Sequence, residues 1–173
     1  MNRAIAFAPL ALLAMLVVVS VVLLLKPDAH QTITAGQMGR PAPAYSLVRL
    51  GGGEPVANAT TNGKPHLINV FASWCGPCIA ENAQLMALQA GGVDIVGIAY
   101  KDNPNDTQLF LDDHGNPYSA VGIDRDGQFA LQLGIAGVPE TFVVSAEGKI
   151  VAVHRGPLTP ADLEREIYPA VRR

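Results

Sequence analysis

The chain has 173 residues, of which 12 are Lys or Arg and 15 are Asp or Glu, giving a formal net charge of -3. This length allows one ordinary domain with a buried core and some additional segments. The mild acidity and the lack of a polybasic run argue against a nucleic-acid partner, because nucleic-acid-binding proteins carry clustered basic residues.

Residues 1–25 are predicted to form a transmembrane anchor. The stretch from Ala4 to Leu25 has 22 residues without a charge. As a helix it would span roughly 33 Å, enough for a hydrocarbon core of about 30 Å. A cleaved signal peptide is the alternative, but its apolar run usually has only about 7–15 residues and ends at a small-x-small site. The following "KPDAHQ" offers no such site, so we expect an uncleaved single span, whose orientation the flanking Lys and Arg residues do not fix.

Residues 26–45 are polar, contain scattered Pro and Gly and show no periodicity, which predicts a linker. Residues 46–173 alternate short apolar runs with amphipathic segments and form the predicted folded domain. Strands are predicted at 45–50, 66–71 and 93–100, and a hairpin at 141–156. One helix is predicted from the cysteines to residue 90, a second over "TQLFLDDHG" with Asp106 as its N-cap, and a third over "GQFALQL". Thr159 and Pro160 are predicted to begin a closing helix. This order predicts an α/β fold with a mixed central sheet flanked by helices.

The helix after the cysteines carries apolar side chains at Ile79, Ala83, Met86 and Ala90. The i, i+4, i+7, i+11 spacing places these residues on one stripe of a helix. This single apolar stripe supports a helix over the segment.

Cys75 and Cys78 are the only cysteines, and they lie in the stretch "FASWCGPCIAENAQL". Cys75 is predicted to follow a strand and to begin a helix, where free backbone N–H groups and the helix dipole favour the thiolate. Cys78, one turn further in, is predicted to be a poorly exposed thiol, and its spacing permits a disulfide with Cys75. Cys75 would therefore attack a partner disulfide, and Cys78 would resolve the mixed disulfide.

Two other uses of the cysteine pair are less well supported by the sequence. A zinc site needs about four ligands, whereas His30, His66, His114 and His154 are scattered without ligand spacing. A purely structural disulfide is possible outside the cytosol, but so small a loop gains little chain entropy from closure. We therefore expect a redox pair and no metal.

The neighbours of the pair fit this interpretation. Pro77 lies in the first turn of the predicted helix, where a missing N–H costs nothing. Trp74 precedes the nucleophile and could shield the site from water, although it could also be an ordinary core aromatic residue.

The sequence resembles a known family at this point. The stretch "NVFASWCGPC" resembles the active-site strand and helix of thioredoxin-fold oxidoreductases. The segments "GRPAPAYSL", "GIAYKDNPNDTQLFL", "GNPYSAVGIDRDG", "GVPETF" and "HRGPLT" are similar, in this order, to the membrane-anchored thioredoxins of cytochrome c biogenesis, the CcmG or DsbE family. The resemblance covers nearly all of residues 38–160 and implies a thioredoxin fold.

The resemblance also implies a function and a location. Members of the family are single-pass inner-membrane proteins whose catalytic domain lies in the periplasm. They act with the cytochrome c maturation machinery and keep the CxxCH motif of apocytochrome c reduced for haem attachment. A membrane electron donor of the DsbD or CcdA type reduces them again. The resemblance therefore implies no cofactor beyond the redox-active cysteines.

The resemblance assigns roles to particular residues. Cys75 matches the nucleophile and Cys78 the resolving cysteine. Pro139 matches the proline that is cis in thioredoxin folds, and a cis bond would present the backbone of Val138 to the substrate chain.

Further residues correspond to the surroundings of the family's active site. Glu81 and Glu140 match acidic residues that could move a proton or raise the cysteine pKa values. Glu81 could instead complement a helix dipole, and Glu140 could be a solvated loop acid. Trp74, Gly76 and Pro77 complete the predicted substrate-binding surface, and the Gly76-Pro77 dipeptide favours a reducing pair.

Two other functions remain open on the sequence. One is a general periplasmic disulfide reductase or oxidase with other clients. The other is a copper-binding module that uses both thiolates, although the sequence places no third soft ligand near them.

Overall fold

The computed structural model describes residues 3–24, 36–61 and 63–172. The chain divides into two compact units, Met1–Gly36 and Gln37–Arg173. The first contains helix α1 (Arg3–Leu24), whose side chains are described over residues 12–22. Among the described residues, no helix combines the length and the apolar character that a membrane crossing requires. Residues 25–35, where the predicted anchor ends and the predicted linker begins, lie outside the described residues.

The second unit is built on one mixed sheet of seven strands in the order β2-β1-β5-β4-β3-β6-β7. The strands are β1 (Ser46–Arg49), β2 (Val56–Ala57), β3 (His66–Phe71), β4 (Asp94–Tyr100), β5 (Ala120–Asp124), β6 (Glu140–Val144) and β7 (Ile150–Arg155). The central strands β3, β4 and β5 run parallel, whereas β6 pairs antiparallel with β3 and β7 antiparallel with β6. All residues of β3 are buried, as expected for a central strand covered on both faces.

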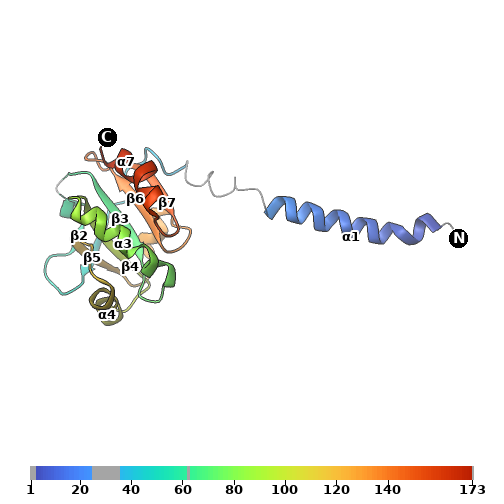
Figure 1. Cartoon of the computed structure of the whole chain (residues 1–173). Helices are drawn as coiled ribbons and strands as arrows, with labels where there is room; N and C mark the ends of the chain where they lie inside the picture. The colour runs from blue at the N-terminus through green and yellow to red at the C-terminus, as the bar shows by residue number, and fades with distance from the viewer. Residues whose placement is uncertain (1–2, 25–35, 62, 173) are drawn as a thin grey trace. The chain divides into compact units, whose positions relative to one another are not determined.

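The helical segments connect and cover these strands (Figure 1). They are η1 (Asn58–Thr61), α3 (Gly76–Ala90), α4 (Pro104–His114), α5 (Gln128–Leu133), α6 (Pro160–Asp162), the π-helical η2 (Leu163–Ile167) and α7 (Tyr168–Val171). The crossovers β3–α3–β4 and β4–α4–β5 advance in the same direction along the sheet. Because such crossovers are right-handed, both helices lie on the same face.

Two apolar clusters fill the space on the two faces of the sheet. The first joins residues of α3, α4 and η2 to the sheet, and it includes both cysteines. The second joins Phe129, Ala130 and Leu133 of α5 to the opposite face. Leu67 belongs to the first cluster and Ile68 to the second, which follows the alternation of side chains along β3. The mixed sheet flanked by helices and the thioredoxin fold are thus confirmed.

The predicted hairpin and closing helix are also confirmed. Strands β6 and β7 pair antiparallel. Thr159 caps α6 in a capping box with Asp162, and Pro160 occupies the first turn. The prediction that Asp106 caps α4 is wrong, because Asn103 is the N-cap and accepts a hydrogen bond from the N–H of Asn105.

The predicted helix after the cysteines is α3, but its apolar stripe is not its buried face. Ile79 and Met86 are 45% and 37% exposed, and Ala83 and Ala90 are exposed as well. The buried stripe consists instead of Cys78, Glu81, Asn82, Leu85 and Leu88. Two polar residues, Glu81 and Asn82, share the core face of this helix, whereas Ile79 and Met86 lie on the opposite side. Glu81 therefore lies on the same buried face of α3 as Cys78, one turn further along the helix.

Candidate active site

The cysteine pair lies where strand β3 passes into helix α3. Cys75 is the N-cap of α3, and its Sγ accepts a hydrogen bond from the N–H of Cys78 over 3.2 Å. The two residues form a disulfide with their Cα atoms 5.3 Å apart. Cys75 and Cys78 are 4% and 3% exposed. A sulfur in this position faces the free N–H groups of the helix start, which stabilise a thiolate once the disulfide is reduced.

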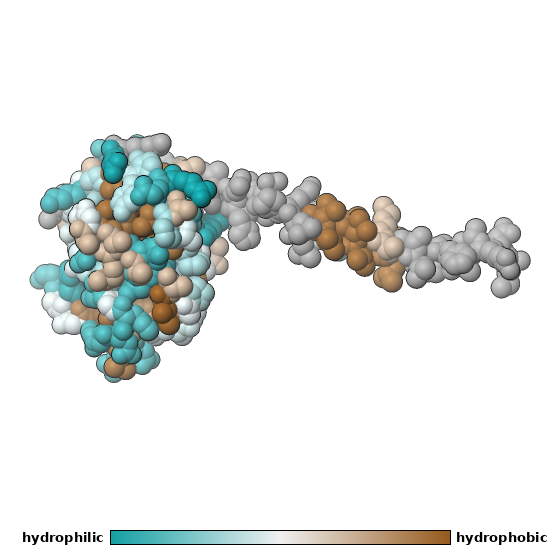
Figure 2. All heavy atoms as spheres, in the orientation of Figure 1, coloured by the Kyte–Doolittle hydropathy of each residue, from teal (hydrophilic) through white to brown (hydrophobic). Residues whose placement is uncertain are grey.

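Exposed residues border the disulfide. Gly76 and Pro77 are exposed, and Trp74 is 59% exposed, so Trp74 is not a core aromatic residue. The indole Nε1 of Trp74 donates to the carbonyl of Lys101 over 3.4 Å. Figure 2 shows small hydrophobic patches among hydrophilic residues on the visible face of this unit.

Strand β6 brings Pro139 and Val138 to the end of β3. Val70 pairs with Glu140 in the antiparallel register, so Pro139 lies beside the last residues of β3, from which the loop to Cys75 leaves. The Val138–Pro139 peptide bond is cis. Pro139 is buried, and Val138 is half-buried and packs against the cluster that contains both cysteines.

Glu81 is fully buried on the core face of α3, one turn after Cys78. Its Oε1 accepts a hydrogen bond from Asn69 Nδ2 over 2.9 Å, and its Oε2 accepts one from the N–H of Leu158 over 3.0 Å. Asn69 also donates to Thr141 Oγ1 over 3.0 Å and accepts from the hydroxyl of Tyr118 over 2.8 Å. A connected polar network therefore runs through the core below the disulfide.

The environment of Glu81 acts on its pKa in two directions. Burial raises the pKa, because the carboxylate is removed from water, and this is the largest effect. The hydrogen bonds from Asn69 and Leu158 stabilise the carboxylate and lower the pKa by a smaller amount. The net result is a pKa above the ordinary value of a glutamate.

Glu140 has a different environment. It is 1% exposed, and its Oε1 accepts a hydrogen bond from Arg155 Nε over 2.9 Å in an ion pair. Its Oε2 accepts from the N–H of Ala136 over 2.8 Å. Glu140 is therefore not a solvated loop acid. It fixes the loop before Pro139 to strand β7 through Arg155.

Asp102 fixes the loop that carries Cys75. Its carboxylate accepts from the N–H of Ser73 over 2.7 Å and from Ser73 Oγ over 2.8 Å. It also accepts from the N–H of Asn103 over 2.9 Å and from Thr107 Oγ1 over 3.0 Å. Asp102 is 6% exposed, so these bonds are shielded from water. The strand-to-helix loop is thereby joined to the start of α4.

Several residues of this site were not predicted from the sequence. They are Asn69, Asp102, Tyr118, Thr141 and Arg155. Asn69 carried a usable signal, because it is an amide in the middle of the otherwise apolar run "HLINVF", and such a residue needs a buried partner. The other four are ordinary in sequence, and their positions depend on strand pairing.

A cysteine pair that forms a disulfide at the start of a helix, beside a buried carboxylic acid, can exchange its disulfide with a partner. On this fold the pair defines a thioredoxin-fold thiol-disulfide oxidoreductase.

Comparison with known proteins identifies the family. Residues 37–168 match the Redoxin family. The thiol:disulfide interchange protein HelX of Rhodobacter capsulatus is 41% identical over 144 residues, which cover 83% of this chain and 80% of HelX. The thiol:disulfide interchange protein DsbE of Escherichia coli K12 is 39% identical over 144 residues, covering 82% of this chain and 78% of DsbE.

Solved structures agree with this result. The crystal structure of a thio-disulfide isomerase from Thermus thermophilus matches with a TM-score of 0.64 and 29% identity, covering 77% of this chain and 96% of that chain. The chain therefore belongs to the CcmG/DsbE family of thiol:disulfide interchange proteins within the Redoxin family.

Proposed function

We propose that this protein reduces the disulfide of the CxxCH haem-attachment motif in apocytochrome c during cytochrome c maturation. The observation that carries the proposal is the match to DsbE and HelX over 144 residues, which includes the cysteine site. The Gly76-Pro77 dipeptide supports the reducing direction. A general disulfide reductase would use the same cysteines, so the preference for the CxxCH motif is the point to be tested.

In the proposed reaction, the Cys75 thiolate attacks one sulfur of the substrate disulfide. A mixed disulfide forms, and the second substrate sulfur leaves as a thiolate. The Cys78 thiolate then attacks Cys75 Sγ, which breaks the mixed disulfide and releases the first substrate sulfur. Two electrons and two protons pass from the dithiol to the substrate, and the Cys75–Cys78 disulfide seen in the structure is the oxidised product.

Glu81 is the better of the two acids for moving a proton in this reaction. It lies one turn after Cys78, and its pKa is raised by burial. It would take the proton of the Cys78 thiol as that sulfur attacks, and the proton would then pass to a leaving thiolate. Glu140 is committed to its ion pair with Arg155 and would position the loop before Pro139. Val138, Trp74, Gly76 and Pro77 would contact the substrate chain.

The proposed location follows from the first residues and from the family. The uncharged run from Ala4 to Leu25 would anchor the protein in the inner membrane, with the catalytic unit in the periplasm. The electron donor would be a membrane carrier of the DsbD or CcdA type, and the cysteine pair would need no cofactor. Carbonate extraction of membranes tests the anchor, because a spanning protein stays in the pellet and a peripheral one is released.

A peptide assay tests the substrate. The reduced protein is mixed with an oxidised peptide containing CxxCH or with a peptide of the same composition whose cysteines are spaced differently. The proposal predicts faster reduction of the CxxCH peptide, with loss of turnover in Cys75→Ser and a trapped mixed disulfide in Cys78→Ser. Equal rates for the two peptides would instead support a general reductase.

A further inference from the structure

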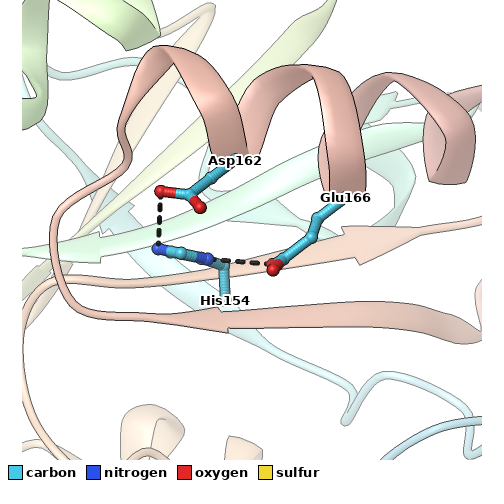
Figure 3. A group of neighbouring side chains, drawn as sticks. All are labelled: His154, Asp162 and Glu166. Carbon is cyan, nitrogen blue, oxygen red and sulfur yellow. Dashed lines mark hydrogen bonds and ion pairs between the residues drawn. The ribbon is translucent and has the colours of Figure 1, made fainter.

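A group of side chains that can bind a metal ion lies on the C-terminal elements of the fold, separate from the cysteine pair (Figure 3). It consists of His154 on β7, Asp162 at the end of α6 and Glu166 in η2. His154 Nδ1 lies 3.0 Å from Glu166 Oε2, and His154 Nε2 lies 3.8 Å from Asp162 Oδ2. One ligand atom from each residue can be chosen so that all three lie within 4.8 Å of one another.

We propose that His154, Asp162 and Glu166 form a binding site for a divalent transition-metal ion, with Zn²⁺ as the best match. An imidazole nitrogen and two carboxylate oxygens are ordinary Zn²⁺ ligands, with bonds of about 2.0–2.2 Å, and water can occupy a fourth position. The imidazole also distinguishes this group from a cluster of acids, because a nitrogen ligand favours Zn²⁺ over Mg²⁺ or Ca²⁺.

The fold prepares the three residues for a common ion. Asp162 and Glu166 are four residues apart and therefore lie near one another on the surface of the helical segment. His154 reaches them from the neighbouring strand, and its side chain is 14% exposed, so the ring is largely held by its surroundings. Binding would replace the present contacts of the imidazole with bonds to the metal.

A supporting residue holds one of the ligands. Thr159 donates to Asp162 Oδ2 from its N–H over 2.9 Å and from its Oγ1 over 2.6 Å. These bonds lower the pKa of Asp162 and keep its carboxylate ionised. Metal-binding carboxylates commonly have such hydrogen-bonded partners, which orient them before the ion arrives. The charges of His154 and of the exposed Arg165 lower the pKa of Asp162 as well.

The sequence could not indicate this group. We predicted no metal site because the four histidines lack ligand spacing. The ligands come from strand β7 and from the helical segments that follow it, and their meeting depends on how the chain turns back between β7 and α6.

Zinc binding to the full chain tests the proposal. The protein is kept oxidised, so that Cys75 and Cys78 cannot bind the ion, and Zn²⁺ is titrated by calorimetry. We expect one equivalent to bind, and we expect His154→Gln and Glu166→Gln each to weaken the affinity at least about tenfold, as loss of a metal-site partner does. Glu164→Gln is the matched control, because Glu164 is an exposed acid in the same segment that is not part of the group.

A second measurement keeps the test independent of folding defects in the His154 variant. In the unmodified protein, Zn²⁺ should shift the imidazole NMR signals of His154 and should raise the unfolding temperature. Glu166→Gln replaces an exposed side chain, and its unfolding temperature should rise less with Zn²⁺ than that of the unmodified protein. The proposal is overturned if no stoichiometric binding occurs, or if Glu166→Gln and Glu164→Gln bind Zn²⁺ with the same affinity.

Discussion

Asp102 should determine how firmly the loop before Cys75 is held, and Asp102→Asn is the sharpest perturbation of it. The asparagine has the same shape, but it replaces one acceptor oxygen with an NH₂ group. Each carboxylate oxygen now accepts one backbone N–H and one hydroxyl. A hydroxyl can rotate and accept from the new NH₂, whereas a backbone N–H cannot. One buried N–H, that of Ser73 or Asn103, must therefore lose its acceptor.

The size of the effect follows from this loss. A buried donor left without a partner costs about 1–3 kcal/mol, and the remaining bonds also lose the assistance of the charge. We expect Asp102→Asn to lower the free energy of unfolding of the oxidised protein by about 1–3 kcal/mol. Asp113→Asn is the control, because Asp113 is exposed on α4 and should change stability by no more than about 0.5 kcal/mol.

Two measurements check this prediction. Urea denaturation gives the free energy of unfolding, and hydrogen exchange of the Ser73 and Asn103 amides reports the local bonds. Exchange of at least one of these amides should accelerate in Asp102→Asn. If stability and both exchange rates match those of Asp113→Asn, Asp102 does not hold the loop.

Three further predictions concern the surroundings of the cysteines. Since burial raises the pKa of Glu81, its contribution to stability is present below the ordinary value of 4.5 and is lost as the pH rises through the raised pKa. Urea titrations should therefore show a decline in stability above pH 4.5 that Glu81→Gln reduces, and an identical decline in both proteins would contradict the raised pKa. Arg155→Met should lower the free energy of unfolding by about 3–5 kcal/mol, because Glu140 stays buried without its cation. The double variant with Glu140→Gln should recover part of this loss. If the losses of the two single variants simply add in the double variant, the ion pair does not stabilise the protein. Trp74→Ala should change the free energy of unfolding by no more than about 0.5 kcal/mol, because the side chain is 59% exposed. Disulfide exchange with the CxxCH peptide should become slower. An unchanged exchange rate would show that Trp74 does not contact the substrate.

The sequence predicts the parts of this protein that depend on local pattern. The strands around "HLINVF" and "VDIVGIAY", the capping box at Thr159 and the position of Cys75 at a helix start all follow from residues close in sequence. The error at α4 is also local. Asn103-Pro104 is a stronger start signal than Asp106, because proline favours the first helical position.

The polar network could not be predicted in the same way. Glu81 receives hydrogen bonds from Asn69 and Leu158, which are 12 and 77 residues away. Its burial contradicts the ordinary preference of glutamate for the surface. Once Glu81 and Asn82 occupy the core face of α3, the apolar residues Ile79 and Met86 remain on the outer face. In α3, apolar periodicity therefore indicates the helix but not its buried face.

The equilibrium reduction potential of the Cys75–Cys78 pair against glutathione tests the direction of electron flow most directly. An electron donor to the haem-site disulfide should have a potential closer to the about -270 mV of thioredoxin than to the about -120 mV of the strongest disulfide-forming proteins. A value near -120 mV would mean that the pair oxidises its partners, and it would contradict the proposed reduction of apocytochrome c.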